Sequence, residues 1–197
     1  MFDAPPDNEY GATYYGAAAI SAALGGDHWM GDGCGRCFKL TGTGNIDGYT
    51  DTTTIILKGT NFCPDGNPHC EDGKSHFDIA APGFDYPSAS ISNTCDTIYT
   101  EEDEPGMLTG DANATDYGQT CAFWMINSQD PDDTDACDCS VLNDEVLRDG
   151  CSNFKSLGWN NPEVDYEVVD CPLELSELPC WEENDWPSPS PDLCTAP

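Results

Sequence analysis

Two residues with titratable side chains, His76 and Asp78, stand two positions apart in a short alternating segment, residues 76–79. On an extended strand they share one face, while Phe77 and Ile79 share the other. We expect the apolar pair to point into a core and the polar pair to face a cleft. A carboxyl group among apolar neighbours resists ionisation and can keep its proton near neutral pH, as a general acid must. The alternative interpretation is that Asp78 is an ordinary aspartate on a solvated strand face.

Cysteine provides the second chemical signal. Twelve cysteines at irregular spacing, with 19 glycines and 15 prolines, indicate a disulfide framework made in an oxidising compartment. We therefore expect a secreted, extracellular protein, and the sequence leaves the disulfide pairing open. Cys34 and Cys37 have the CxxC spacing of zinc and redox sites, but no second CxxC and no β-α-β pattern accompanies them. This favours neither a zinc site nor a thioredoxin-like activity.

The charge balance excludes several classes of partner. The chain has 37 acidic and 6 basic residues, a net charge of −31. Nucleic acids and anionic membranes are bound through Lys and Arg, so we expect no nucleic acid and no membrane partner. The acidic runs at 100–104 and 130–135 are expected to be solvated surface. A calcium site in the second run is the alternative, although that run lacks the EF-hand pattern.

Short elements must position the candidate residues. Alternating and β-branched segments predict strands at 11–16, 37–41, 52–58, 76–79, 121–126 and 165–169. Short helices are predicted at 17–24 and 141–148, and residues 1–9 are predicted to form a loose lead-in. Short strands with turns and little helix indicate an all-β barrel or sandwich.

Four motifs in a fixed order resemble those of a known family. They are residues 31–42 (GDGCGRCFKLTG), 60–64 (TNFCP), 76–79 (HFDI) and the closing stretch with 158–163 (GWNNPE) and 166–171 (YEVVDC). Together they resemble glycoside hydrolase family 45, small secreted endoglucanases that share a six-stranded double-psi β-barrel with expansins. The matching parts are roughly residues 11–82 and 137–181.

The resemblance implies a fold and a domain organisation. The expected fold is mainly β, a six-stranded double-psi β-barrel with long disulfide-pinned loops and a few short helices. Residues 1–181 would form a single catalytic domain, with 85–140 as a long loop insertion. Residues 182–197 would be a proline-rich C-terminal tail.

The resemblance also implies a reaction. The family hydrolyses internal β-1,4-glucosidic bonds with inversion, which requires an acid on the leaving oxygen and a base that activates water on the opposite face. Asp78 matches the position of the family's general acid. The base of many members lies two residues beyond a tyrosine that matches Tyr14. That position falls on Gly16, and glycine cannot take a proton.

Other residues are therefore candidates for the base. One branch of the family is thought to use an asparagine in the loop before the acid, and Asn67 matches that loop. Glu71, seven residues before Asp78, is an alternative base or an assisting carboxylate, and Asp72 is a third candidate. An inverting pair should stand about 6.5–9.5 Å apart, and the sequence does not decide among these residues.

A glucan site combines aromatic platforms for the sugar faces with polar groups for the hydroxyls. By position in the family motifs, Thr13, Tyr14 and Asn61 are expected to bind substrate. His76 is expected to orient the cleft wall through a hydrogen bond, and Trp186, in a polar stretch, is a further aromatic candidate. We expect a monomer that binds β-1,4-glucan and needs no cofactor and no metal.

Three functions remain open at this point. The first is a secreted endo-β-1,4-glucanase that acts on cellulose or mixed-linkage glucan. The second is an expansin-like protein that binds and loosens wall polysaccharide without hydrolysis, which Gly16 and Thr13 favour. Against it, expansins carry a second β-sandwich domain, and few residues follow Cys171. The third is an acidic calcium-binding extracellular protein, which would explain the charge but not the motifs.

Overall fold

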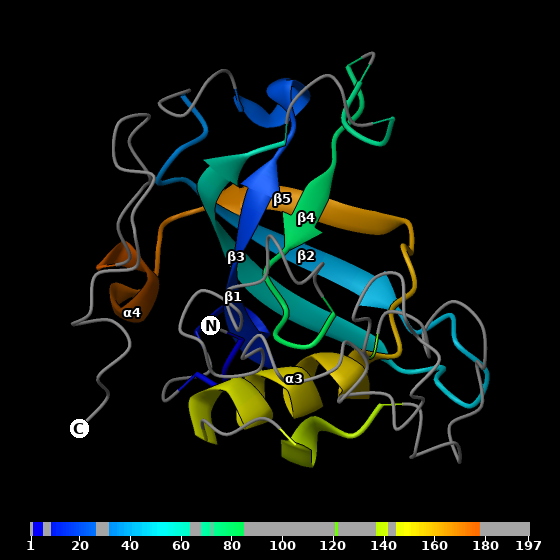
Figure 1. Cartoon of the computed structure of the whole chain (residues 1–197). Coiled ribbons are helices and arrows are strands. Elements are labelled where there is room, and N and C mark those ends of the chain that lie inside the picture. Colours follow the sequence, from blue (N-terminus) through cyan, green and yellow to red (C-terminus); the bar gives the residue numbers. More distant parts are fainter. Residues whose placement is uncertain are drawn as a thin grey trace, which may run out of the picture.

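The five strands of the structure, a computed structural model, form one sheet (Figure 1). They are β1 (Tyr14–Ile20), β2 (Cys37–Thr43), β3 (Thr52–Phe62), β4 (Phe77–Ile79) and β5 (Val164–Val169). The helices named among the described residues are α3 (Glu145–Leu157), α4 (Leu173–Ser176) and the 3-10 turns η1 (Glu9–Gly11), η2 (Ala22–Leu24) and η5 (Cys139–Val141). The structure describes residues 2–5, 9–26, 32–63, 68–71, 73–84, 121, 137–141 and 145–177.

The strand order across the sheet is β4-β1-β3-β2-β5. β1 and β3 run parallel, and the other three pairs are antiparallel. β3 is the middle strand, and Ile55, Ile56 and Leu57 within it are fully buried. The prediction of a central strand at 52–58 is therefore confirmed, and the strand continues to Phe62. The strands predicted at 37–41 and 165–169 are confirmed as β2 and β5.

The two edge strands, β4 and β5, approach each other through side chains. The Phe77 and Tyr166 rings lie 5.6 Å apart between centroids, and the hydroxyls of Ser75 and Tyr166 are 3.1 Å apart. Within the described residues, however, β4 and β5 exchange no ladder hydrogen bonds, so the sheet stays open. The mainly β fold with few helices is confirmed. The described sheet has five strands, and the six-stranded closed barrel that the resemblance implied is not confirmed.

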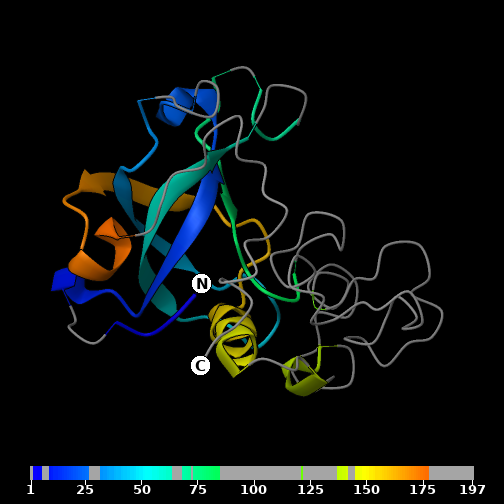
Figure 2. The same ribbon diagram turned by 60° about the vertical axis from the view of Figure 1, so that its left-hand side comes forward.

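The main core lies between the sheet and α3. Figures 1 and 2 place α3 beneath one end of the sheet, and its Phe154 and Leu157 contribute to the core. The other members are Phe2, Ala18, Ile20, Leu24, Phe38, Leu40, Ile55, Leu57, Ala81 and Trp159. A smaller cluster on the opposite face includes Tyr15, Ile56 and Leu175 of α4. Both faces of β3 are thus covered, which explains its continuous apolar run.

The alanine-rich segment 17–24 corrects the helix prediction. Residues Ala17–Ile20 belong to β1, and only Ala22–Leu24 forms a short 3-10 turn. Alanine favours helices by well under 1 kcal/mol per residue. Hydrogen bonding of β1 to strands on both sides, together with burial of Ala18 and Ile20, outweighs that preference.

The helix predicted at 141–148 begins later and runs longer, from Glu145 to Leu157. It ends at Gly158, which has φ +59°, a conformation that favours glycine at a helix C-terminus. A Cβ there would also lie 2.1 Å from Cγ of Tyr49. Both the backbone conformation and the lack of space therefore require glycine at this position. Only Cys121 of the segment predicted as a strand at 121–126 is described, and it is helical, so the strand prediction is wrong at that residue. The proposed tail 182–197 lies outside the described residues.

The first described part of the lead-in, residues 2–5, is packed rather than loose. Phe2 is fully buried, and Asp3 bridges to Tyr15 of β1 through two backbone hydrogen bonds of 2.9 and 2.7 Å. The Phe2 ring contacts those of Tyr14 and Phe154, with centroids 5.3 and 5.5 Å away. The segment therefore joins β1 to α3.

Candidate functional site

Asp78 lies on β4, opposite Ala19 of β1. Its neighbours Phe77 and Ile79 pack against the core, so the predicted alternation is confirmed. His76 Nε2 is 3.0 Å from Asp78 Oδ1. The expected apolar surroundings are wrong, because the Asp78 side chain is 49% exposed and its neighbour is an imidazole. The pair is thus a solvent-accessible carboxylate and imidazole that can exchange a proton or bind hydroxyl groups.

A second histidine extends this polar surface. The rings of His69 and His76 are stacked, with centroids 5.6 Å apart and an angle of 21° between planes. The stack leaves 22% of the His76 side chain exposed. His76 therefore contacts both the imidazole of His69 and the carboxyl group of Asp78, and these two contacts orient its ring.

Ser21, which the sequence analysis missed, fixes the position of the segment from Lys74 to His76. It is fully buried directly after β1, and its Oγ donates to Lys74 O at 2.6 Å and accepts from His76 N at 3.0 Å. Its own N–H donates to His76 O at 3.1 Å. The available signal was a serine that directly follows an apolar strand, where a buried hydroxyl needs partners.

A disulfide bond lies beside Asp78. Cys63 and Cys70 are bonded, and their sulfurs and an Asp78 carboxylate oxygen lie within 4.8 Å of one another. As a disulfide the two sulfurs offer no thiolate to a metal. The bond closes the loop that contains Asn67, which itself lies outside the described residues. Glu71 directly follows Cys70, is half-buried, and accepts a backbone hydrogen bond from Lys74 through its carbonyl.

Asn61 lies in the same row as Asp78. Ala19 of β1 is paired with Asp78 on one side and with Asn61 of β3 on the other. Paired residues project from the same face of a sheet, and adjacent strands are about 4.8 Å apart. The carboxyl and the amide therefore flank a small alanine across three strands. Asn61 Oδ1 also accepts a 2.7 Å hydrogen bond from Phe62 N.

Thr13 and Tyr14 lie at the other end of β1. Tyr14 and Ala19 are five positions apart, or about 17 Å along an extended strand. Tyr14 packs against the core, and its hydroxyl is 2.9 Å from Ser156 Oγ of α3. Thr13 is exposed, and its N–H donates to Thr54 O at 2.7 Å. The structure thus brings Asp78, His76 and Asn61 together and holds Thr13 and Tyr14 apart from them.

The side chain of another residue fills the space beside Gly16. A Cβ built on Gly16 would lie 2.8 Å from Cδ2 of Phe2 and 3.1 Å from Cδ2 of Leu57. The phenylalanine ring therefore takes up the space into which a longer side chain at this position would project.

Several candidates lie outside the described residues. They are Asn67, Asp72, Trp186 and the acidic run 130–135. In the described part of the chain, no helix has the length and apolar character needed to cross a membrane.

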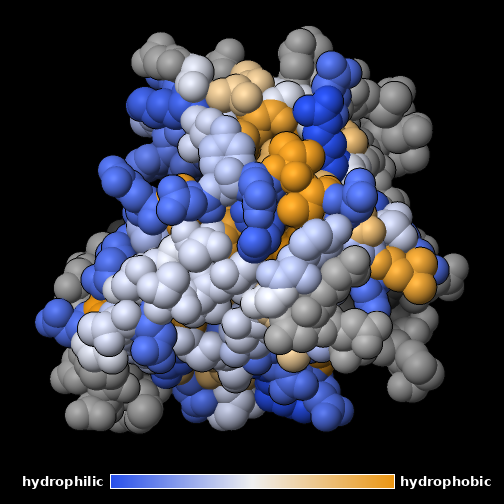
Figure 3. All heavy atoms as spheres, turned by 180° about the vertical axis from the view of Figure 1, so that it is seen from behind, coloured by the Kyte–Doolittle hydropathy of each residue, from blue (hydrophilic) through white to orange (hydrophobic). Residues whose placement is uncertain are grey.

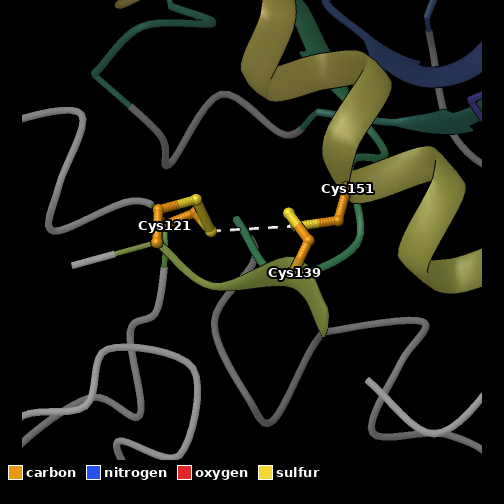
Figure 4. A group of neighbouring side chains, drawn as sticks. Cys121, Cys139 and Cys151 are labelled. Carbon is orange, nitrogen blue, oxygen red and sulfur yellow. Dashed lines mark hydrogen bonds between the residues drawn. A yellow bond between two sulfur atoms is a disulfide. The ribbon is translucent and has the colours of Figure 1, made fainter. Parts of the chain in front are cut away.

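Two further disulfides meet in a buried sulfur cluster (Figure 4). Cys121 is bonded to Cys137, and Cys139 is bonded to Cys151 of α3. All four sulfurs lie within 4.8 Å of one another, and the contact between Cys121 and Cys151 measures 3.8 Å. With Cys37–Cys171, these bonds confirm the predicted disulfide framework. The cluster anchors α3 but, as two disulfides, has no thiolate for a metal.

The comparisons with known proteins identify one family. The family model described as EXPB1-like domain 1 matches residues 7–124, more than half of the chain. This range includes β1 to β4 with Asp78, and it extends into the segment 85–140 that the sequence analysis interpreted as an insertion. Among curated protein sequences, none matches the chain significantly.

Proposed function

The chain belongs to the EXPB1-like domain 1 family of expansin domains, and from this premise we propose that it binds and loosens cell-wall polysaccharide without hydrolysing it. Expansin-like domains bind wall polysaccharides, so a β-1,4-glucan is the proposed partner. The four described disulfides support action in an oxidising, extracellular compartment. We also propose that the protein acts as a monomer.

The Gly16 position is the observation that carries this proposal. An inverting hydrolase needs a base opposite its acid. At the position where the resemblance puts the base, this chain has a glycine, and that position faces the core side chains of Phe2 and Leu57, whereas Asp78 projects from the face of Ala19. Neither the glycine nor the apolar side chains beside it can take a proton from water.

The surface around Asp78 supports binding. The carboxylate accepts hydrogen bonds, and the His76 and His69 imidazoles can both donate and accept them. Asn61 adds an amide in the same row, on the far side of Ala19. Such groups can bind the ring hydroxyls of a sugar chain.

The experiment compares binding with hydrolysis. Wild-type protein is incubated with insoluble cellulose and with hydroxyethyl cellulose, and bound protein, solution viscosity and reducing ends are measured. Mechanical extension of isolated wall strips under constant load reports loosening. We expect binding and extension without reducing ends, and Asp78→Asn should weaken binding while the fold is kept. Release of reducing ends by wild type but not by Asp78→Asn would contradict the proposal.

A second candidate is an inverting endo-β-1,4-glucanase, and one contact favours it. The sulfurs of the Cys63–Cys70 bond lie within 4.8 Å of a carboxylate oxygen of Asp78, the position of the family's general acid, and this bond closes the sequence segment that contains Asn67. In that mechanism Asp78→Asn abolishes hydrolysis, and Asn67→Ala lowers turnover more than Glu71→Ala. The opposite ranking would move the base role to Glu71.

A further inference from the structure

The side chain of Tyr166 on β5 is exposed, and contacts with neighbouring side chains fix its position. It is 44% exposed, and its hydroxyl is 3.1 Å from Ser75 Oγ in the segment that leads into β4. Its ring meets Phe77 and Phe38 at 70° and 63°, with centroids 5.6 and 6.5 Å away. Neither phenylalanine lies parallel to the tyrosine ring, so they support it without stacking on it. The result is a preorganised aromatic surface at the seam between β4 and β5.

Val168 continues this surface along β5. It is 59% exposed and is paired with the fully buried Phe38, just as Tyr166 is paired with Leu40. Residues two apart on a strand share a face, so Tyr166 and Val168 lie side by side. β5 lies at the back of Figure 1, and the view from behind shows an exposed apolar area bordered by hydrophilic residues (Figure 3).

The charges around this surface limit what can bind there. Asp165 and Glu167 alternate with Tyr166 and Val168 along β5 and so project from its other face, and the whole chain has a net charge of −31. Of the 6 basic residues, four lysines already have acceptors for their ammonium groups. These acceptors are Glu167 for Lys39, Ser176 O for Lys58, Pro68 O for Lys74 and Cys137 O for Lys155. A polyanion would meet repulsion with few cations to offset it.

We propose that Tyr166 and Val168 form a sugar-binding subsite for an uncharged β-linked glucan and select it over acidic polysaccharides. This inference rests on the proposed function and adds a subsite for the same substrate class on the Phe77 side of β4, whereas Asp78 projects from the other side. The C–H face of a pyranose ring packs on an aromatic ring and a neighbouring aliphatic group, while its hydroxyls reach the polar rim. Ser75 links the subsite to the Asp78 surface, because it contacts Tyr166 and lies three residues before Asp78.

The test uses two ligands with the same glucan backbone. Hydroxyethyl cellulose is uncharged and carboxymethyl cellulose is anionic, and affinity electrophoresis gives a Kd for each. We expect wild type to bind the uncharged polymer with little dependence on salt. Binding to the anionic polymer should be weaker and should improve as salt screens the repulsion.

The variants locate the site. Tyr166→Ala should weaken the Kd for hydroxyethyl cellulose by about tenfold, the size of one aromatic contact. Tyr166→Phe keeps the ring and should stay within about twofold of wild type, because the lost hydroxyl bond is exposed. Leu173→Ala, a change at a side chain that is 72% exposed on α4, is the matched control and should bind normally. Val168→Ser is an independent second variant whose exposed position favours normal folding, and it should also weaken binding.

The outcomes distinguish failure of the proposed function from failure of the subsite alone. If folded wild type binds neither polymer nor insoluble cellulose, the proposed function and the subsite are both overturned. If wild type binds hydroxyethyl cellulose and both Tyr166→Ala and Val168→Ser bind it equally well, the subsite alone is overturned. Tighter binding to carboxymethyl cellulose would overturn the selection for uncharged glucan.

Discussion

The ring of Phe2 fills the space beside Gly16, so that a Cβ at residue 16 would lie 2.8 Å from the ring. The two residues lie in different segments of the chain. One belongs to a segment that bridges to Tyr15, and the other is the position where the resemblance puts a catalytic base. Their contact fills the space beside a position that carries no ionisable group.

Gly16→Ala should destabilise the fold through overpacking, by about 1–3 kcal/mol, because the methyl group must displace the Phe2 ring. Phe2→Ala should cost about 3–5 kcal/mol, because it leaves a cavity. In the double variant the new methyl group enters that cavity, so the combined loss in the free energy of unfolding should be smaller than the sum. Urea unfolding of all four proteins measures this coupling, and strictly additive losses would refute the contact.

Ser21→Ala should loosen the segment from Lys74 to His76. The change removes both side-chain hydrogen bonds of a fully buried residue and leaves His76 N and Lys74 O without this partner. Unsatisfied buried groups cost about 1–3 kcal/mol each, so the free energy of unfolding should fall by a comparable amount. Binding to insoluble cellulose should weaken as well, because the Asp78 surface loses its support.

Ser156→Ala is the matched control for Ser21→Ala. Its hydroxyl also makes two hydrogen bonds, to Tyr14 and to Asn153 O, but it is exposed on α3. Water can replace these bonds, so the loss should stay below about 1 kcal/mol and binding should not change. Equal losses for the two variants would count against a special role for Ser21.

Local patterns predicted the strands that carry Asp78 and the middle of the sheet. The alternation at 76–79 correctly separates Phe77 and Ile79 from His76 and Asp78, because period two follows from strand geometry alone. The apolar run at 52–58 likewise predicts a strand covered on both faces. The alanines at 17–19 misled the prediction, because their helix preference is weaker than pairing on both sides.

The parts that sequence reasoning missed depend on contacts between distant segments. Burial of Phe2 follows from its packing against Tyr14 and Phe154, which no local pattern reports. The separation of Tyr14 from Asp78 has the same origin. A family motif gives the order of residues along the chain, whereas the register between β4 and β1 decides which end of β1 Asp78 occupies. Tyr166 was passed over because its exposure depends on how β4 and β5 approach each other.

Cys137→Ser should allow disulfide exchange within the sulfur cluster. The variant leaves Cys121 as a thiol, 3.8 Å from the Cys151 sulfur in the present structure. Its thiolate can attack that sulfur, forming a Cys121–Cys151 bond while Cys139 leaves as a thiolate and takes up a proton. Alkylation at mildly alkaline pH followed by peptide mapping should therefore find label on both Cys121 and Cys139.

Cys70→Ser is the control for this exchange. It leaves Cys63 as a thiol, and the group of sulfurs around Cys63 in the described residues contains no second disulfide. The label should then appear on Cys63 and not on the sulfur cluster. Label confined to Cys121 in the Cys137→Ser protein would contradict exchange between the two bonds.

Asp138 should make a small, acid-sensitive contribution to stability. Hydrogen bonds from the Ser140 side chain and backbone, with Lys155 nearby, hold the pKa of the Asp138 carboxyl below its usual value of 3.8. The folded state therefore binds this proton less readily than the unfolded state. The stabilisation is complete above the unfolded pKa and is lost as the pH falls through the folded pKa. Asp138→Asn removes the charge, so its melting temperature should fall below that of wild type by about 1–3 °C at pH 6.

That difference should close as the pH falls below the usual aspartate range, because wild-type Asp138 is then protonated as well. Ser140→Ala offers a matched test, since it removes one of the bonds that lower the pKa and should reproduce part of the loss at pH 6. Differential scanning calorimetry of the three proteins at pH 2.5, 4 and 6 measures the trend. If the difference in melting temperature between wild type and Asp138→Asn grew as the pH fell, the loop at η5 would stabilise the neutral carboxyl and not the carboxylate.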